Sequence, residues 1–194
     1  MKKTYNIILA GYGGQGVLTM VEILAQAALA TGLDVKQAEL HGLAQRGGST
    51  ECHIRIGEKV LSPLITRAEA DLIIGLELLE TFRACYYADP NKTSIIVNHK
   101  YWAPDPLKAE TKKTEEIINN LKRFTKNLKL VEAEKLLTEN NLNLTMSNTL
   151  MLAIVAKQNL LPMSEEQILN ALRVKIKPQF FAANQKIFDL VDKI

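Results

Sequence analysis

The hydrophobic positions of the chain follow two periods, one typical of strands and the other typical of helices. Residues 71–76 (DLIIGL) and 93–98 (TSIIVN) are nearly continuous apolar runs, as expected for central strands with helices on both faces. The predicted strands are residues 5–10, 35–40, 49–56, 71–76, 93–98 and 128–131. The predicted helices follow residue 16 up to about residue 32, cover 114–124, and begin again near residues 133, 145, 165 and 178. Strands and helices alternate, which is the pattern of an α/β domain.

The order of these elements predicts the topology. A strand, a loop, a helix and a second strand open the chain, so we expect a βαβ unit with a right-handed crossover. Apolar and polar residues alternate over 49–56, and residues 59–61 are predicted to pair back on this strand as a hairpin. We therefore expect one domain over residues 1–194, with a three-layer Rossmann-like α/β fold, a mixed, mainly parallel sheet and a β-hairpin.

Composition limits the location of the protein. Hydrophobic residues make up 47% of the chain and charged residues 23%, which is typical of a soluble globular domain. The longest nearly uncharged stretch, residues 142–156, is shorter than the roughly 20 apolar residues of a membrane span. Residues 1–3 lead directly into the first predicted strand, without the apolar stretch of a secretory signal peptide. We expect a cytoplasmic protein that does not enter a membrane.

Cysteine content and charge limit the cofactors and partners. Cys52 and Cys85 are too few for an iron–sulfur cluster, which normally needs four thiolates, and Cys52 falls on the apolar face of its predicted strand. The net charge of +3 is small, and the lysines between residues 108 and 135 are interleaved with glutamates. We therefore expect no cluster in this chain and no nucleic acid as its partner.

A glycine-rich loop, which we call the first glycine segment (residues 11–16), lies between the first predicted strand and the first predicted helix. Gly11, Gly13 and Gly16 fit the G-x-G-x-x-G pattern of a dinucleotide-binding turn. Glycines let backbone amides approach a phosphate, and the helix N-terminus attracts its charge. The candidates for contact with a phosphate-bearing ligand or a partner protein are Gly11, Gly13, Gly14, Gln15 and Gly16.

Two alternatives remain open for this segment. One is an NAD-binding domain, because Glu39 lies near the end of the second predicted strand, where a ribose-binding acid is expected. Against it, dinucleotide binding does not require Gly14 and Gln15, and a further strand follows where the next crossover helix is expected. The other alternative is that the glycines only form tight turns.

The second glycine segment (residues 45–48) contains Gln45, Arg46, Gly47 and Gly48, which are also candidate ligand contacts. A guanidinium group between small residues can bind a carboxylate or phosphate through two hydrogen bonds. The alternative is an exposed arginine in a glycine turn.

Two further polar residues lie near predicted element ends. His41 is either a polar contact in the same pocket or a turn residue. Asn148, near the start of an apolar helix, is interpreted as the cap of that helix.

Several motifs together resemble a known family. They are GYGGQGVLT (11–19), ELHGLAQRGGS (39–49), HIRIG (53–57), SPLI (62–65), EAD (69–71), MSNT (146–149) and LLP (160–162), followed by Asn184 and Phe188 in the last predicted helix. In order and spacing these motifs resemble the small (beta) subunit of indolepyruvate:ferredoxin oxidoreductase, a member of the gamma-type 2-oxoacid:ferredoxin oxidoreductase domains. The resemblance covers nearly the whole chain and is weakest over residues 100–135. The form HG-x-AQRGG favours the indolepyruvate branch over the pyruvate, ketoisovalerate and 2-oxoglutarate gamma subunits.

This resemblance implies a subunit that is inactive alone. It implies oxidative decarboxylation of an aryl 2-oxoacid with coenzyme A as co-substrate, and electron transfer to ferredoxin. Thiamine diphosphate, magnesium and [4Fe-4S] clusters are then expected in a large (alpha) partner subunit, with none bound by this chain alone. Alternatives are the gamma subunit of a pyruvate/ketoisovalerate oxidoreductase and a stand-alone nucleotide-binding module.

Overall fold

The computed structural model describes residues 4–41, 47–102 and 111–192. The strands are β1 (Thr4–Tyr12), β2 (Asp34–His41), β3 (Ser49–Gly57), β4 (Leu72–Gly75), β5 (Ser94–Asn98) and β6 (Asn127–Val131). The helices are α1 (Val17–Ala30), α2 (Leu78–Ala84), α3 (Thr111–Leu121), α4 (Ala133–Glu139), α5 (Ser147–Lys157), α6 (Glu165–Lys175) and α7 (Pro178–Val191). Two short 3-10 turns are η1 (Cys85–Tyr87) and η3 (Leu144–Met146). The six predicted strands at 5–10, 35–40, 49–56, 71–76, 93–98 and 128–131 are confirmed, whereas α2 was not predicted.

The six strands form one sheet in the order β2-β3-β1-β4-β5-β6. The pairs β1–β4, β4–β5 and β5–β6 are parallel, whereas β3 is antiparallel to both of its neighbours. The expected mixed, mainly parallel sheet is therefore confirmed. Because β3 lies between β1 and β2, the first βαβ unit joins two strands that are not neighbours.

The predicted hairpin between residues 49–56 and 59–61 is wrong. β3 pairs with β1 from Ser49 to Gly57 and with β2 on its other side, so the antiparallel neighbours consecutive in sequence are β2 and β3. The amide of Val60 donates a hydrogen bond to the Asp34 carboxylate at 2.8 Å. This bond holds the segment after β3 at the start of β2, where it does not form a strand.

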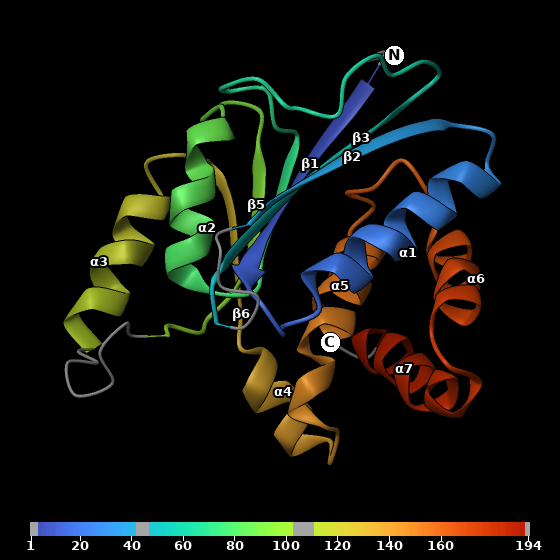
Figure 1. Ribbon diagram of the computed structural model, residues 1–194. Helices are drawn as coiled ribbons and strands as arrows, with labels where there is room; N and C mark the ends of the chain where they lie inside the picture. Colours follow the sequence, from blue (N-terminus) through green and yellow to red (C-terminus); the bar gives the residue numbers. More distant parts are fainter. Residues whose placement is uncertain (1–3, 42–46, 103–110, 193–194) are drawn as a thin grey trace.

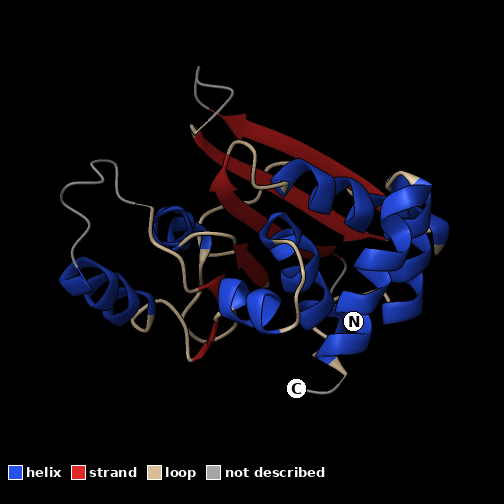
Figure 2. Cartoon of the chain, turned by 90° about the horizontal axis from the view of Figure 1, so that it is seen from below, coloured by secondary structure: helices blue, strands red, loops and turns tan. Residues whose placement is uncertain are grey.

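Helices cover both faces of the sheet, as the three-layer prediction required (Figure 1). Ile7 and Leu9 of β1 belong to the core under α1, α5, α6 and α7, whereas Ile8 and Ala10 belong to the core under α2 and α3. All four side chains are at most 1% exposed. The view from below shows the sheet between the two groups of helices (Figure 2).

The predicted capping box at the start of α6 is confirmed. The Ser164 hydroxyl accepts a hydrogen bond from the Gln167 amide at 3.3 Å, and the Gln167 side chain accepts one from the Ser164 amide at 2.8 Å. Both bonds satisfy amides that the first helical turn leaves without partners.

Candidate functional site

The carboxyl ends of β1 and β4 meet at the edge of the sheet where the first glycine segment lies. From β1 the chain passes through α1 to β2 on one side, whereas β4 lies on the other side of β1. The helices that follow these two strands, α1 and α2, cover opposite faces (Figure 1). Ligands of open α/β sheets bind in the crevice at such a point.

Two glycine segments that are far apart in sequence meet at this edge. The Gly13 amide donates to the Gly48 carbonyl at 2.9 Å, and the Gly47 amide donates to the Gly13 carbonyl at 3.3 Å. These bonds continue the β1–β3 ladder, whose last partners are Tyr12 and Ser49. The structure thus brings together Gly47, Gly48 and the first glycine segment.

The other members of the second motif, Gln45 and Arg46, lie outside the described residues. The side chain of His41 is also outside the described part of the structure, so its predicted contact stays a prediction.

Gln15 shapes the first glycine segment from within. Its side-chain carbonyl accepts the Tyr12 amide at 2.8 Å, and its own amide donates to the Tyr12 carbonyl at 3.1 Å. A Cβ atom at Gly11 would lie 2.7 Å from this side-chain oxygen, so a larger residue there would displace the Gln15 carboxamide from the Tyr12 amide. The carboxamide oxygen of Gln15 is therefore engaged in folding the loop.

Gly14 and Gly16 both have the left-handed conformation, with φ of 99° and 83°. Nothing lies within 4 Å of a Cβ built on Gly14, which is exposed to solvent. A Cβ on Gly16 would lie 2.3 Å from Nδ2 of Asn148. The segment is therefore open at Gly14 and closely packed at Gly16.

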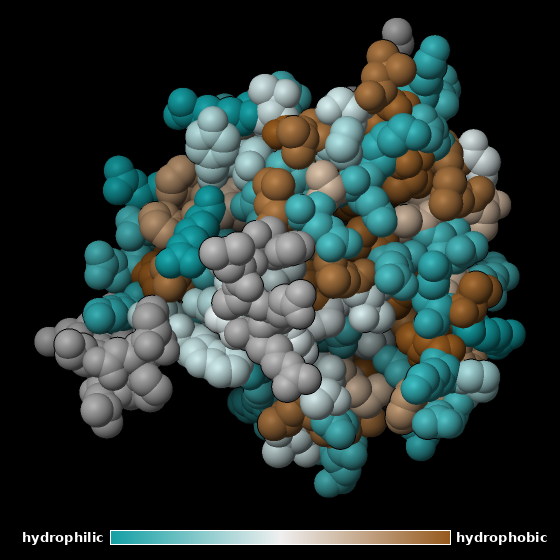
Figure 3. All heavy atoms as spheres, viewed as in Figure 1, coloured by the Kyte–Doolittle hydropathy of each residue, from teal (hydrophilic) through white to brown (hydrophobic). Residues whose placement is uncertain are grey.

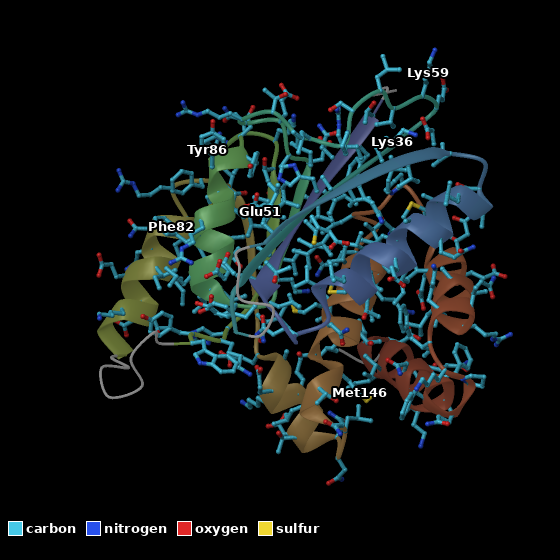
Figure 4. All side chains as sticks on the ribbon, viewed as in Figure 1. Lys36, Glu51, Lys59, Phe82, Tyr86 and Met146 are labelled. Carbon is cyan, nitrogen blue, oxygen red and sulfur yellow. The ribbon has the colours of Figure 1, made fainter. Side chains whose placement is uncertain are left out.

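Asn148 does not occupy the predicted cap position of α5, although its Oδ1 accepts the Thr149 amide of the first turn at 2.9 Å. The cap position of α5 is Met146, and its side chain makes no capping bond. Asn148 lies within the first turn, and its Nδ2 donates to the Gly16 carbonyl at 3.5 Å. Asn148 thus packs α5 against the first glycine segment. Figure 4 labels Met146, the cap residue of this helix, near the lower end of the molecule.

The N-terminus of α1 is available to an anion. Its cap residue, Gly16, offers no side-chain bond, and no acidic residue lies in the first turn. First-turn amides and the helix dipole carry partial positive charge. Within the described residues, α1 therefore begins without a side-chain cap, next to the open side of Gly14.

Two buried carboxylates follow β4 at the same edge of the sheet. Neither was predicted from the sequence as a site residue. Glu77 is fully buried, accepts the Glu80 amide at 2.8 Å and the Trp102 amide at 2.9 Å, and caps α2. Burial raises the pKa of Glu77, and the hydrogen bonds from the amides oppose this shift. Glu80 is 3% exposed and accepts the Ser49 hydroxyl at 2.5 Å. A sequence signal existed, because Glu77 directly follows the apolar run 71–76 at the carboxyl end of a strand and Glu80 comes three residues later.

An aromatic pair flanks the same edge. The rings of Tyr12 and Trp102 meet edge to face, with centroids 5.9 Å apart, and Trp102 is 53% exposed. Lys100 approaches the Trp102 ring at 6.0 Å and pairs with Glu134 at 2.9 Å. Burial, followed by the charges of the two carboxylates, raises the pKa of the Tyr12 phenol above its ordinary value.

The position of β3 argues against the NAD-binding alternative. Glu39 lies on β2, opposite Cys52 of β3, and β3 separates it from β1. In the dinucleotide fold the strand with the ribose-binding acid is adjacent to β1. Because β3 lies between β2 and β1, Glu39 is one strand spacing, roughly 4.8 Å, further from β1 than in the dinucleotide fold.

Neither cysteine fits a cluster ligand. Cys52 and Cys85 belong to different cores, one on each face of the sheet. Burial raises the pKa of each thiol to about 12. The described parts of the chain contain no group of three or more His, Cys, Asp or Glu residues placed to hold a metal ion. Nor do these parts contain a helix long and apolar enough to cross a membrane.

Comparison with known proteins identifies similar chains. The family described as pyruvate ferredoxin/flavodoxin oxidoreductase matches residues 6–191. The indolepyruvate oxidoreductase subunit IorB of Archaeoglobus fulgidus is 36% identical over 93% of this chain and 90% of its own length. The common gamma subunit of the pyruvate/ketoisovalerate oxidoreductases of Pyrococcus abyssi is 34% identical over 76% of this chain and 74% of its own.

A solved structure has the same fold. It is the 2-oxoglutarate:ferredoxin oxidoreductase of Magnetococcus marinus with 2-oxoglutarate, coenzyme A and succinyl-CoA bound. The TM-score is 0.74 at 17% identity, and the match covers 100% of this chain but 32% of the other. The fold described above therefore also occurs as one part of a longer polypeptide.

Proposed function

The chain belongs to the pyruvate ferredoxin/flavodoxin oxidoreductase family, and from this premise we propose that it is the small subunit of an indolepyruvate:ferredoxin oxidoreductase. The family match confirms the resemblance that the motifs suggested. Support for the indolepyruvate branch is the 36% identity to IorB of A. fulgidus across nearly the full length of both chains.

The proposed reaction is the oxidation of an aryl 2-oxoacid with coenzyme A. The bond between the carboxylate and the keto carbon breaks and releases carbon dioxide. The acyl carbon then forms a thioester with the coenzyme A sulfur, whose proton is released, and two electrons pass to ferredoxin. Thiamine diphosphate, with magnesium, and [4Fe-4S] clusters would supply this chemistry in a larger partner subunit, because Cys52 and Cys85 do not fit cluster ligands.

The observation that carries a role for this chain is the meeting of the two glycine segments beside the uncapped start of α1. Coenzyme A carries a diphosphate and a further phosphate, and anions bind well where backbone amides and a helix N-terminus converge. We assign this contact to Gly14, Gly16 and Gly48, whereas Gly13 and Gly47 hold the two segments together, because their amides donate to the carbonyls of Gly48 and Gly13. The assignment extends to Gln45 and Arg46, which lie outside the described residues. Gly11 and Gln15 shape the loop.

The partner is proposed to be a large subunit that contains thiamine diphosphate. In the 2-oxoglutarate:ferredoxin oxidoreductase of M. marinus, the matching fold is 32% of a longer chain. A domain that occurs joined to further chain in one protein is expected to bind a separate chain in another. Free Cys52 and Cys85 are compatible with a reducing compartment, so we place the complex in the cytoplasm.

The proposal is tested by reconstitution. The chain is purified alone and together with the large chain found in the native cell. Reduction of ferredoxin or a viologen dye is then measured with indolepyruvate, phenylpyruvate, pyruvate and 2-oxoisovalerate, with and without coenzyme A. We expect activity only in the complex, only with coenzyme A, and greatest with an aryl oxoacid. Stable assembly without activity toward any oxoacid would overturn the proposal.

The second candidate is a gamma subunit of a pyruvate/ketoisovalerate oxidoreductase. It is supported by the 34% identity to the P. abyssi subunit. A preference of the same complex for pyruvate or 2-oxoisovalerate would favour this candidate. Absence of a large partner on purification from the native cell would favour a stand-alone nucleotide-binding module.

A further inference from the structure

Glu80 lies where the two glycine segments and α2 meet. Its Oε2 accepts the Ser49 hydroxyl at 2.5 Å, and its Oε1 accepts Arg83 Nη1 at 2.6 Å. The charge of Glu80 is also one cause of the raised pKa of the Tyr12 phenol, after burial and the charge of Glu77. With 3% of its surface exposed, this carboxylate is held by two side chains, Ser49 from β3 and Arg83 from its own helix α2.

Ser49, which donates to Glu80, adjoins both glycine segments. It is preceded by Gly48 in the chain and pairs with Tyr12 of the first segment in the β1–β3 ladder. The backbone bonds between Gly13 and the second segment lie one residue away from this pair. Through Ser49, Glu80 therefore anchors to α2 the point where the two segments pair with each other.

Stability alone gives little reason for a carboxylate at this place. Burial of a charge is costly, and its hydrogen bonds and ion pairs only offset that cost. Further along β3 from Ser49, other polar side chains lie on the same face of the strand. His53 contacts Glu51 at 3.1 Å, and Figure 4 shows Glu51 beside α2 in the middle of the sheet. At Glu80 the hydrogen bond from Ser49 fixes the end of β3, beside which the two glycine segments pair at the candidate ligand site.

We propose that Glu80 is a positioning residue that holds the two glycine segments in the geometry that binds an anionic ligand. Its negative charge would repel a phosphate, so it acts through Ser49 and not by direct contact. Coenzyme A as the ligand rests on the function proposed above. The role of Glu80 in ordering the segments does not depend on that identity.

The first test is amide hydrogen exchange in the full chain, followed at Gly13 and Gly47. In Glu80→Ala we expect both amides to exchange about ten- to 100-fold faster, since bonds to a charged group are lost. Glu80→Gln should show a smaller increase, because its amide oxygen still accepts the Ser49 hydroxyl. The control is Ser164→Ala, which weakens the distant start of α6 and should leave these two amides as in the wild type.

The second test is steady-state kinetics of the complex with its partner. For Glu80→Ala, KM for coenzyme A should rise about tenfold or more while kcat changes less, and Glu80→Gln should recover part of the loss. Ser164→Ala should match the wild type in both constants.

Unchanged exchange at Gly13 and Gly47 in Glu80→Ala would overturn the proposal. It would also be overturned if exchange increased without any change in KM for coenzyme A. If the wild-type complex had no activity with any oxoacid, the proposed function would fail. Hydrogen exchange in the isolated chain would then still decide whether Glu80 orders the segments.

Discussion

The N-termini of α1 and α6 are built in opposite ways, although the two helices pack against each other. The first turn of α6 is closed by a serine, a reciprocal glutamine and two acidic residues, Glu165 and Glu166. The first turn of α1 follows a left-handed glycine and has neither a side-chain cap nor an acid in its described residues. A capped start stabilises the helix without a ligand, whereas an open start leaves amides for one. This difference agrees with the proposed ligand contact at the start of α1, whereas α6 needs no ligand to complete its first turn.

Gly16→Val tests the closed side of the α1 start and has the largest expected effect. A branched side chain at a φ of 83° is strained, and its Cβ would meet Asn148 Nδ2. We expect a loss of about 3 kcal/mol or more in the free energy of unfolding, measured with urea. Adding Asn148→Ala should recover the contact part of this loss and leave the backbone strain. Wild-type stability of Gly16→Val would contradict the described packing.

Gly14→Val separates strain from binding. Gly14 and Gly32 both have a left-handed φ, are exposed, and would have open space around an added Cβ atom, but Gly32 lies at the far end of α1. Each valine variant should lose about 1 to 3 kcal/mol of stability. Only Gly14→Val should also lower kcat/KM of the assembled enzyme, by about tenfold or more, because it blocks close approach of a phosphate. Equal activity of the two variants would assign the first glycine segment to a simple turn.

Ser164→Ala removes the cap of α6. The expected cost is about 1 kcal/mol, measured by urea unfolding, because one amide of the first turn loses its partner. Kinetic constants of the complex should stay at the wild-type values, since α6 begins far from the glycine segments in sequence and carries none of the proposed contacts. A changed KM for coenzyme A would remove the distinction between the two helix starts.

Leu18→Glu places an acid in the first turn of α1 and has the smallest effect on stability. Leu18 is 42% exposed, so the substitution needs no burial of charge. The helix dipole should make the variant about 0.5 kcal/mol more stable, whereas the same charge should raise KM for coenzyme A several-fold. Leu18→Gln is the neutral control for both measurements. A more stable variant with unchanged KM would show that no anion binds at this helix start.

The hydropathy of the surface does not by itself indicate where the candidate site lies. Hydrophobic and hydrophilic residues are interspersed over the face shown in Figure 3. The exposed apolar residues include Leu61, Leu64 and Tyr86 near the amino ends of the strands as well as Trp102 near the carboxyl ends. The pairing of the glycine segments therefore identifies the site better than surface hydropathy does.

The sequence could predict what depends on near neighbours. The apolar runs gave the strands, the Ser164–Gln167 spacing gave the capping box, and the position of the first glycine segment between a strand and a helix gave half of the candidate site. It failed for α2, because seven residues hold too few turns for a helical period. It also failed for residues 59–61, where the Asp34 carboxylate takes the amide that a hairpin would need.

What the sequence by itself determined is thus the six strands, most of the helices and the family, because periodicity and local motifs carry that information. Only the tertiary structure decided that β3 enters between β1 and β2, which moves Glu39 away and brings Gly47 and Gly48 to Gly13. It also decided that Glu80 bonds to Ser49, 31 residues away. The physical reason is that alternation along a strand fixes which face is buried but leaves the neighbouring strand open. That choice depends on the packing of the whole sheet between its two layers of helices.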